Sequence, residues 1–153
     1  MTDPKEAGPA GGCMCGAVRF ETIGQPTRTI HCHCEDCRRH TGAPVATLAV
    51  FAEEQVEFSG LPRKIFNSSS GTGRAFCPEC GTSLTFEADF HSYGLVCAIH
   101  ISAFDDPDNV TPTHHSYLSE RISWFDIADD LPRYKRLVVH GELMGHGPQL
   151  EQR

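Results

Sequence analysis

The sequence has no long hydrophobic run and no excess of basic residues. Its longest apolar stretch, around Pro44–Ala52, is far shorter than the roughly 20 residues that a membrane-spanning helix needs. There are 13 Lys and Arg against 20 Asp and Glu, and the net charge of -7 argues against a nucleic-acid-binding protein with a basic face. The polar start, MTDPKEAGPAGG, lacks the apolar segment of a secretory signal. We therefore expect a cytoplasmic protein that binds neither membrane nor nucleic acid.

Apolar residues are also scarce, at 39% of the chain. At 153 residues the chain has the size of one domain, which is large enough to bury a core without help from disulfides or metal. Residues 1–10 are polar and contain two prolines, and residues 139–153 are rich in Gly, Gln and Glu. We expect a disordered N-terminal tail over 1–10, a single domain over 11–138, and a polar C-terminal tail over 139–153.

Long helical patterns are missing as well. Val18 and Phe20 alternate with Arg19 and Glu21, which is the period-two pattern of a half-buried strand. Similar patterns predict short strands over residues 18–21, 45–51, 56–58, 65–66, 83–87 and 95–103, with 67–73 as a loop. Short helical turns are expected only over 35–40 and near 132–136. With 14 Gly and 10 Pro to form turns, this pattern indicates a mainly β fold, either a sandwich or an open barrel.

The chain has eight cysteines, and in a reducing compartment these favour metal binding over disulfides. The sequence CPECG over residues 77–81 has the form of a zinc knuckle, whose glycine takes a positive φ while backbone N–H groups point at the sulfurs. The sequence CMCG over 13–16 has a similar ending. We expect one closed tetrahedral zinc site with the ligands Cys13, Cys15, Cys77 and Cys80. A redox dithiol is the alternative for CPECG, but it would need a βαβ context that the sequence lacks.

The second cluster, Cys32, Cys34 and Cys37, offers three thiolates. Three protein ligands are typical of a zinc site that keeps one position for water or substrate. Arg38, Arg39 and His40 follow this cluster and place positive charge beside it. The alternative is a second structural zinc, closed by a neighbouring side chain; the candidates are His31, His33, Asp36 and His40.

The remaining cysteine and most histidines are not expected to bind metal. Cys97 shares an apolar strand face with Leu95, Ile99 and Ile101, which indicates a buried core thiol. The other candidates lack a helical i, i+4 partner, and we expect surface or loop positions for them; they are His91, His114 and His115.

Three segments together are similar to the glutathione-dependent formaldehyde-activating enzymes, whose relatives include centromere protein V. They are GGCMCGAVRF, HCHCEDCRRHTGAP and FCPECGTSLTF, and the resemblance extends from about Gly11 to about Arg136. It implies a zinc-pinned β-tent of two small antiparallel sheets. It also implies a structural zinc at the four cysteines named above and a second zinc at Cys32, Cys34 and Cys37, the catalytic centre, near which glutathione binds. The implied reaction joins glutathione and formaldehyde into S-(hydroxymethyl)glutathione, a carbon–sulfur lyase activity.

The chemistry of a trithiolate zinc suits a thiol co-substrate. Such a centre is a modest Lewis acid, better suited to holding a fourth thiolate than to forming a reactive hydroxide. Glutathione, or another low-molecular-weight thiol, would then add to formaldehyde or a related aldehyde. Glutathione carries two carboxylates, which arginine side chains bind well. The candidate binding residues beside the cluster are Arg38, Arg39, Thr41 and Gly42. Further basic candidates are Arg63, Lys64 and Arg74, each of which is otherwise a solvated surface charge.

Two other functions fit the same residues. One is a non-catalytic zinc module that binds a protein partner, since the sequence offers no obvious general base. Candidates by proximity alone are His33, Glu35, Asp36 and His40. The other is a thiol redox sensor that releases the second zinc on oxidation.

Overall fold

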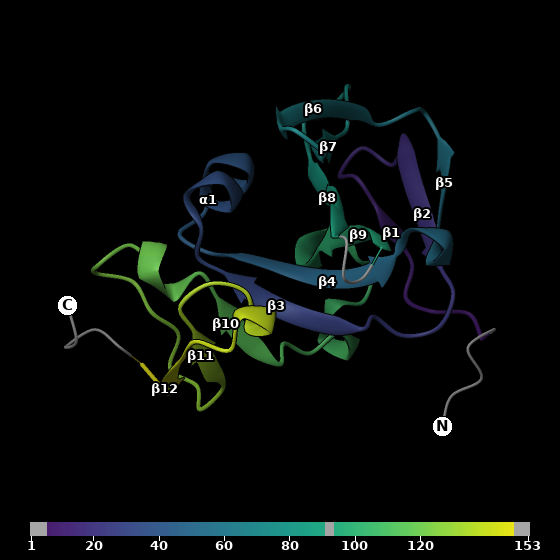
Figure 1. The fold of residues 1–153 in the computed structure, drawn as a ribbon. Helices are drawn as coiled ribbons and strands as arrows, with labels where there is room; N and C mark the ends of the chain where they lie inside the picture. Colours follow the sequence, from purple (N-terminus) through teal and green to yellow (C-terminus); the bar gives the residue numbers. More distant parts are fainter. Residues whose placement is uncertain (1–5, 91–93, 149–153) are drawn as a thin grey trace. The chain divides into compact units, whose positions relative to one another are not determined.

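The computed structural model describes residues 6–90 and 94–148 (Figure 1). Within these residues the chain forms twelve short strands and one α-helix, so the fold is mainly β, as predicted. The strands form two sheets. In the described ranges no helix is long and apolar enough to span a membrane. His91 lies outside the described residues.

The chain divides into two compact units. Unit 1 comprises the described residues of Met1–Arg28 and Ala49–Thr111, and unit 2 those of Thr29–Leu48 and Pro112–Arg153. Strand β4 (Ala46–Ala52) belongs to unit 2 up to Leu48 and to unit 1 from Ala49. The prediction of a single domain over residues 11–138 stays a prediction.

Unit 1 contains the three-stranded sheet, in the order β1 (Gly11–Gly12), β2 (Val18–Thr22) and β5 (Val56–Gly60). It also contains four antiparallel neighbours in the order β9 (Gly94–His100), β8 (Ser83–Phe90), β7 (Thr72–Phe76) and β6 (Lys64–Ser69). The predicted loop over residues 67–73 is wrong, because it is the turn of the β6–β7 hairpin and parts of both strands. Short 3-10 turns cover Glu53–Gln55, Ile101–Ala103 and Pro107–Asn109.

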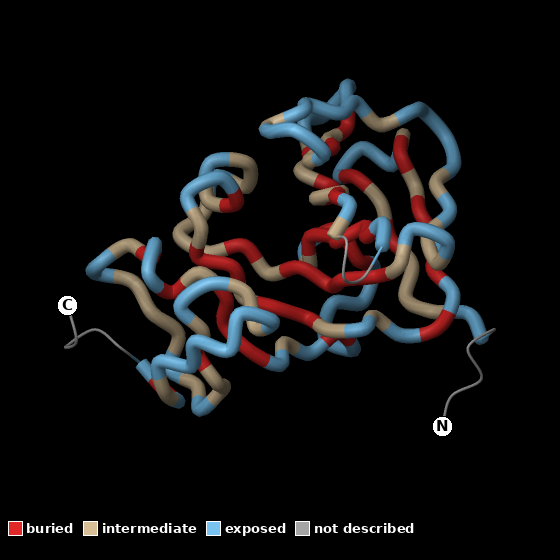
Figure 2. The backbone as a smooth tube through the Cα atoms, viewed as in Figure 1, coloured by how far each residue is buried: buried red, intermediate tan, exposed pale blue. Residues whose placement is uncertain are grey.

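The core of unit 1 is aliphatic and aromatic. Phe20 is buried with its ring edge-on to Phe104, at 5.3 Å between centroids. Leu84 and Ile99 are fully buried beside them in the same cluster. Burial of each such side chain contributes about 1.5–3 kcal/mol. Three cysteines belong to this cluster, Cys13, Cys77 and Cys97; the first two are members of the first cysteine group, so the core reaches that group directly. Figure 2 shows the contrast with β6, which is almost entirely exposed.

Unit 2 contains four neighbouring strands in the order β12 (Leu143–His146), β11 (Pro132–Tyr134), β10 (His114–Ser116) and β3 (Arg28–Cys32). The pairing departs from the all-antiparallel expectation, because β10 runs parallel to both β3 and β11. A parallel pair needs a long connection between its strands, and β3 and β10 are far apart in sequence. Short 3-10 turns cover Leu118–Glu120 and Val138–His140.

The helix α1 (Glu35–Thr41) confirms the helical turn predicted over residues 35–40. Cys34 caps its first turn by accepting a hydrogen bond from the backbone N–H of Cys37 at its sulfur, at 3.3 Å. Gly42 ends the helix in the left-handed conformation, with φ 69°, a conformation that glycine adopts without steric cost.

The second predicted helical turn is wrong, because residues 132–134 form strand β11. Pro132 is the first residue of this strand, a position that proline tolerates. The polar tails also carry structure in their described parts. Ala7 makes a β-bridge with Ile23, and β12 pairs with β11.

Candidate metal centres

The first cysteine group brings together Cys13, Cys15, Cys77 and Cys80, all in unit 1, with sulfur atoms within 4.8 Å of one another. Two tight turns position them. Gly16 (φ 78°) and Gly81 (φ 76°) take the positive φ that the motifs predict. Their backbone N–H groups donate to the carbonyls of Cys13 and Cys77, at 3.0 and 2.9 Å. Each turn therefore folds one cysteine pair back on itself.

The spacing of these sulfurs fits zinc. A Zn–S bond of about 2.3 Å in a tetrahedron places the sulfurs about 3.8 Å apart, and Cys15 lies 3.8 Å from Cys77 and 3.5 Å from Cys13, sulfur to sulfur. Backbone N–H groups point at the sulfurs as well, Val18 to Cys13 at 3.2 Å and Glu79 to Cys77 at 3.4 Å. Side-chain and backbone hydrogen bonds with Thr82 lower the pKa of Cys80 to about 5, which favours the thiolate that zinc requires.

The second group brings together Cys32, Cys34 and Cys37 in unit 2, again with sulfurs within 4.8 Å. Cys32 ends β3, Cys34 caps α1, and Cys37 lies in its first turn. Among the described residues no further Cys, His, Asp or Glu completes this group. The proposed closing ligands His31 and His33 belong to other groups, and Asp36 and His40 to none of them.

The three sulfurs are crowded enough to oppose ionisation on their own. Interactions with Cys34 and Cys37, together with burial, raise the pKa of Cys32 well above its usual range. Adjacent thiolates repel one another in a poorly solvated site. A divalent cation removes that repulsion and draws the protons off. The donor set therefore fits zinc.

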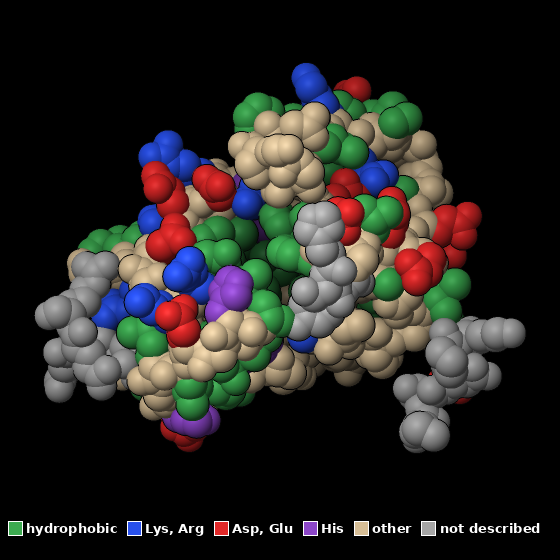
Figure 3. Space-filling view, viewed as in Figure 1, with side chains coloured by type: hydrophobic (Ala, Val, Ile, Leu, Met, Phe, Trp, Pro, Cys, Tyr) green, Lys and Arg blue, Asp and Glu red, His purple; other side chains and the backbone are tan. Residues whose placement is uncertain are grey.

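The predicted binding residues beside this group have separate roles in the fold. Arg38 donates from Nε to the carbonyl of His33 and from NH2 to the carbonyl of Glu120, both at 3.1 Å. Arg39 is exposed and forms an i, i+4 ion pair with Glu35 at 2.8 Å. Figure 3 shows Lys, Arg, Asp and Glu side chains intermixed on one face of the molecule.

The other two predicted binding residues end the helix. The hydroxyl of Thr41 donates to the carbonyl of Cys37 at 2.8 Å. Gly42 has open space where a Cβ would lie. The Thr41 hydrogen bond therefore ties the end of the helix to Cys37, and Gly42 lets the helix end in the left-handed conformation.

The more distant basic candidates lie in unit 1. Arg63 pairs with Glu87 and stacks on the ring of Phe58, 3.9 Å from its centroid. Arg74 is buried and hydrogen-bonds the hydroxyl of Ser68 at 3.1 Å. Lys64 is exposed on β6. Cys97 is buried, as predicted, and burial raises its pKa.

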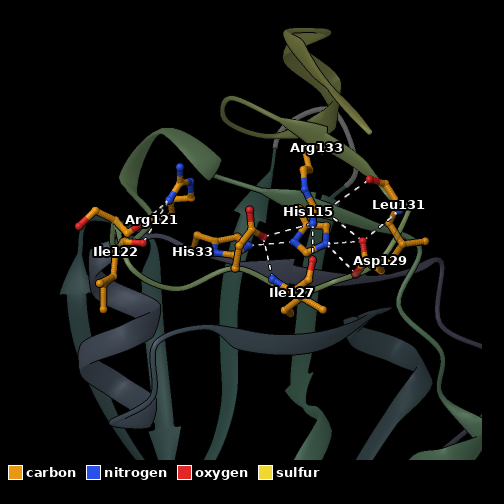
Figure 4. A network of polar contacts seen from close by, with 10 residues as sticks. His33, His115, Arg121, Ile122, Ile127, Asp129, Leu131 and Arg133 are labelled. Carbon is orange, nitrogen blue, oxygen red and sulfur yellow. Dashed lines mark hydrogen bonds and ion pairs between the residues drawn. The ribbon is translucent and has the colours of Figure 1, made fainter. Parts of the chain in front are cut away.

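A buried histidine chain in unit 2 was not predicted. Nε2 of His33 lies 2.8 Å from Nδ1 of His115, and Nε2 of His115 lies 3.0 Å from a carboxylate oxygen of Asp129 (Figure 4). The expected surface position of His114 and His115 is wrong, because both are buried on β10. A polar pair in a three-residue strand carries no hydrophobic pattern from which burial follows.

Arg133 closes the far end of this chain. Its guanidinium is fully buried and pairs with Asp129 at 3.0 Å and Asp126 at 3.2 Å. His31, His33 and His115 come close enough to these carboxylates to suggest two further metal groups. A cation there would face the Arg133 charge, and both ring nitrogens of His115 already make hydrogen bonds. The arrangement is therefore a hydrogen-bonded network.

Burial disfavours the protonated form of the histidines in this network. Burial, followed by the repulsion that a protonated His115 would exert, lowers the pKa of His33 to about 3 and that of His31 to about 4. Burial and the neighbouring Arg133 lower the pKa of His115.

Tyr117 is the residue directly after strand β10, which carries His115. With φ 55°, it is the one residue other than glycine with a positive φ in the described part of the chain. Burial and the charges of Cys32 and Cys34 raise the pKa of its phenol. A strained backbone of this kind requires support from the surrounding structure.

Residues 9–120 match the family described as glutathione-dependent formaldehyde-activating enzyme. The chain belongs to this family. The matched range contains both cysteine groups and most of the histidine chain, while Asp126, Asp129 and Arg133 follow it.

Two individual proteins are also similar to this chain. An uncharacterized lyase of Schizosaccharomyces pombe is 33% identical over 76 residues, which cover 50% of this chain and 55% of the lyase. The alignment thus spans about half the length of this relative. A crystal structure of a Rhodobacter sphaeroides protein superposes with a TM-score of 0.52 at 20% identity, covering 65% of this chain and 93% of that one. This second likeness shows the fold alone.

Proposed function

We propose that this protein is a zinc-dependent carbon–sulfur lyase of the S-(hydroxymethyl)glutathione synthase type, and that it joins glutathione to formaldehyde or a related aldehyde. Family membership supports a glutathione-related lyase. The observation that carries the proposal is the second cysteine group. Its three sulfurs converge, and no fourth Cys, His, Asp or Glu among the described residues joins them.

An incomplete donor set suits a thiol substrate. Cys32, Cys34 and Cys37 would hold the metal, and zinc, when bound, lowers the pKa of a thiol that joins it. In the reaction the glutathione sulfur forms a bond to the aldehyde carbon. The electron pair of the C=O bond moves to the oxygen, which takes up a proton. No oxidant or reductant is needed.

The rest of glutathione needs partners for two carboxylates. Arg39 is the better candidate beside the cluster, because its side chain is 77% exposed and its ion pair is with Glu35 of the same short helix. Arg38 is hydrogen-bonded to the backbone carbonyls of His33 and Glu120 and therefore positions these two backbone segments. Arginine binds carboxylates in a bidentate manner, which gives orientation as well as affinity.

A cobalt-substituted protein tests the proposal directly. Adding glutathione should change the thiolate-to-metal charge-transfer bands, and S-methylglutathione should not, because it offers no thiolate. Cys34→Ser should abolish the response. Cys97→Ala serves as the matched control, since Cys97 lies in the core of unit 1 and its replacement should leave the response intact.

Turnover is measured separately. Formaldehyde should be consumed faster than in a mixture of glutathione and formaldehyde alone, and Cys34→Ser should fall to that background. Binding of glutathione without acceleration would favour a carrier or a redox sensor. If neither binding nor acceleration is observed, the protein is a zinc-stabilised module or uses a different thiol.

A further inference from the structure

His33 lies between Cys32 and Cys34 in the sequence, and hydrogen bonds hold it at three points. Its backbone N–H donates to the carbonyl of Ser116 at 3.0 Å. Its carbonyl accepts from Nε of Arg38 at 3.1 Å. Its ring, with 0% exposure, is hydrogen-bonded to His115 at 2.8 Å. The segment between Cys32 and Cys34 therefore cannot move without breaking buried hydrogen bonds.

The hydrogen bond between the two rings has a definite direction. Asp129 is ionised, since it pairs with the fully buried Arg133. The nitrogen of His115 that faces it, Nε2, must therefore carry a proton. A neutral His115 then has a bare Nδ1, which can only accept. Nε2 of His33 is thus the donor, and its Nδ1 is bare.

At its other end, the series of hydrogen bonds from His33 through His115 is anchored on Asp129 and Arg133. Arg133 donates from NH1 to Asp129 at 3.0 Å, and from NH2 to Asp126 at 3.2 Å and to the carbonyl of Ile127 at 2.6 Å. The backbone N–H of Leu131 also donates to Asp129, at 3.0 Å. Figure 4 shows His115, Arg133 and Leu131 arranged around the Asp129 carboxylate. Asp129 is therefore a fixed point to which the His33 ring is tied.

We propose that Asp129, acting through His115, is a positioning residue for the metal centre formed by Cys32, Cys34 and Cys37. The chain Asp129–His115–His33 fixes the residue between two ligands and so sets how tightly this centre holds its metal. The proposal rests on the proposed function in one respect only, namely that this cysteine group binds a metal. Neither glutathione nor formaldehyde enters its test.

His115→Phe is the decisive variant, because it keeps a ring of similar size and removes both hydrogen bonds of the chain. His114→Phe is the matched control. His114 is also buried on β10, but its ring contacts Thr113 and Tyr134, at 3.0 Å and edge-on at 5.6 Å between centroids. Metal affinity is measured for full-length protein by competition with a chromophoric chelator, with zinc and with cobalt.

Outer partners of metal ligands typically change affinity by about 10–100-fold. We expect a loss of that size at the second centre in His115→Phe, together with altered cobalt d–d bands, and less than about twofold in His114→Phe. The first centre should keep its metal in both variants. Equal losses in the two variants, or an unchanged second centre in His115→Phe, would overturn the proposal.

The wild-type protein offers a test that no folding defect can obscure. Long-range proton–nitrogen NMR distinguishes a protonated ring nitrogen from a bare one. His33 and His115 should each be protonated at Nε2 and bare at Nδ1. A His33 ring protonated at Nδ1 would contradict the direction of the chain. Failure of glutathione to alter the cobalt spectrum would instead contradict the proposed function and leave this inference standing.

Discussion

Two residues in the first cysteine group show how far a local motif determines geometry. Gly16 and Gly81 were expected to take positive φ, and they do, at 78° and 76°. Neither has an atom within 4 Å of the position where a Cβ would lie. The requirement for glycine is therefore conformational and not a matter of space.

Gly81→Ala should accordingly lower the free energy of unfolding by about 1–2 kcal/mol, the cost of placing an L side chain in the left-handed region. Metal should remain bound, since all four thiols are retained. Urea unfolding of the metal-loaded protein and its zinc content measure the two effects. Gly42→Ala, with φ 69° and equally open surroundings, is a matched control far from this cysteine group in sequence. Loss of zinc from Gly81→Ala would show that the turn does more than bend the chain.

The two neighbouring arginines after Cys37 should respond differently to truncation. Arg39→Ala should weaken glutathione binding about tenfold, which corresponds to 1.4 kcal/mol, without changing stability, because exposed ion pairs contribute little. Arg38→Ala should lower stability by removing two hydrogen bonds to backbone carbonyls. Calorimetric titration with glutathione and thermal melts measure the two effects. Equal weakening of binding without any loss of stability in Arg38→Ala would show that both side chains bind the substrate.

At the scale of elements, sequence patterns predicted the strands that have apolar alternation. Strands β2, β4, β5 and β8 lie where they were expected, and so does α1. Strand β9 was expected over 95–103, but it ends at His100 and residues 101–103 form a 3-10 turn. Strands β10 and β11 are three residues long and largely polar, with His115 and Arg133 fully buried, so no period-two pattern exists to detect. Their burial depends on ion pairs and hydrogen bonds between segments far apart in sequence.

The second cysteine group was predicted from its spacing and from the family resemblance, but the buried histidine chain beside it was not. A usable signal was present in His31-Cys32-His33, where alternate residues of a strand share one face. Asp129 also precedes Arg133 by four residues, a spacing common in ion pairs, and Asp126 precedes it by seven. What sequence could not supply was the pairing of β10 with β3, which brings His115 to His33.

Strand β11 should depend strongly on its buried arginine. Arg133→Met leaves Asp126 and Asp129 without their cation, and removal of one partner of a buried pair typically costs about 3–5 kcal/mol. Arg19→Met is the matched control. Arg19 also pairs with an aspartate, Asp105, but both side chains are about half exposed, at 42% and 57%, so the loss should stay below about 1 kcal/mol. Chemical denaturation compares the two variants. Similar losses would mean that the carboxylates of unit 2 are solvated or protonated once Arg133 is gone.

At the scale of the whole molecule, the two cysteine groups differ in what they link. The first joins Cys15 to Cys77, 62 residues apart in sequence, and lies within unit 1. The second joins residues only five positions apart, Cys32 to Cys37, and lies within unit 2. A cross-link that closes a long loop restricts the unfolded chain more than one that closes a short loop. The difference between these two loop lengths amounts to about 2 kcal/mol.

Metal removal should therefore proceed in two phases. A chromophoric chelator should first take zinc from the three-thiol group, with loss of the glutathione response but little change in circular dichroism. Further chelator should empty the four-thiol group and unfold unit 1, because closed thiolate sites contribute directly to folding.

Cys34→Ser should remove only the first phase and stay folded, whereas Cys80→Ser should aggregate or melt far below the wild type. A single phase of release, or equal damage from both variants, would mean that the two groups do not divide into a structural and a functional centre. The order of the phases carries the same information, because a closed tetrahedron of thiolates must lose a protein ligand before a chelator can bind, while the three-thiol group already offers a position.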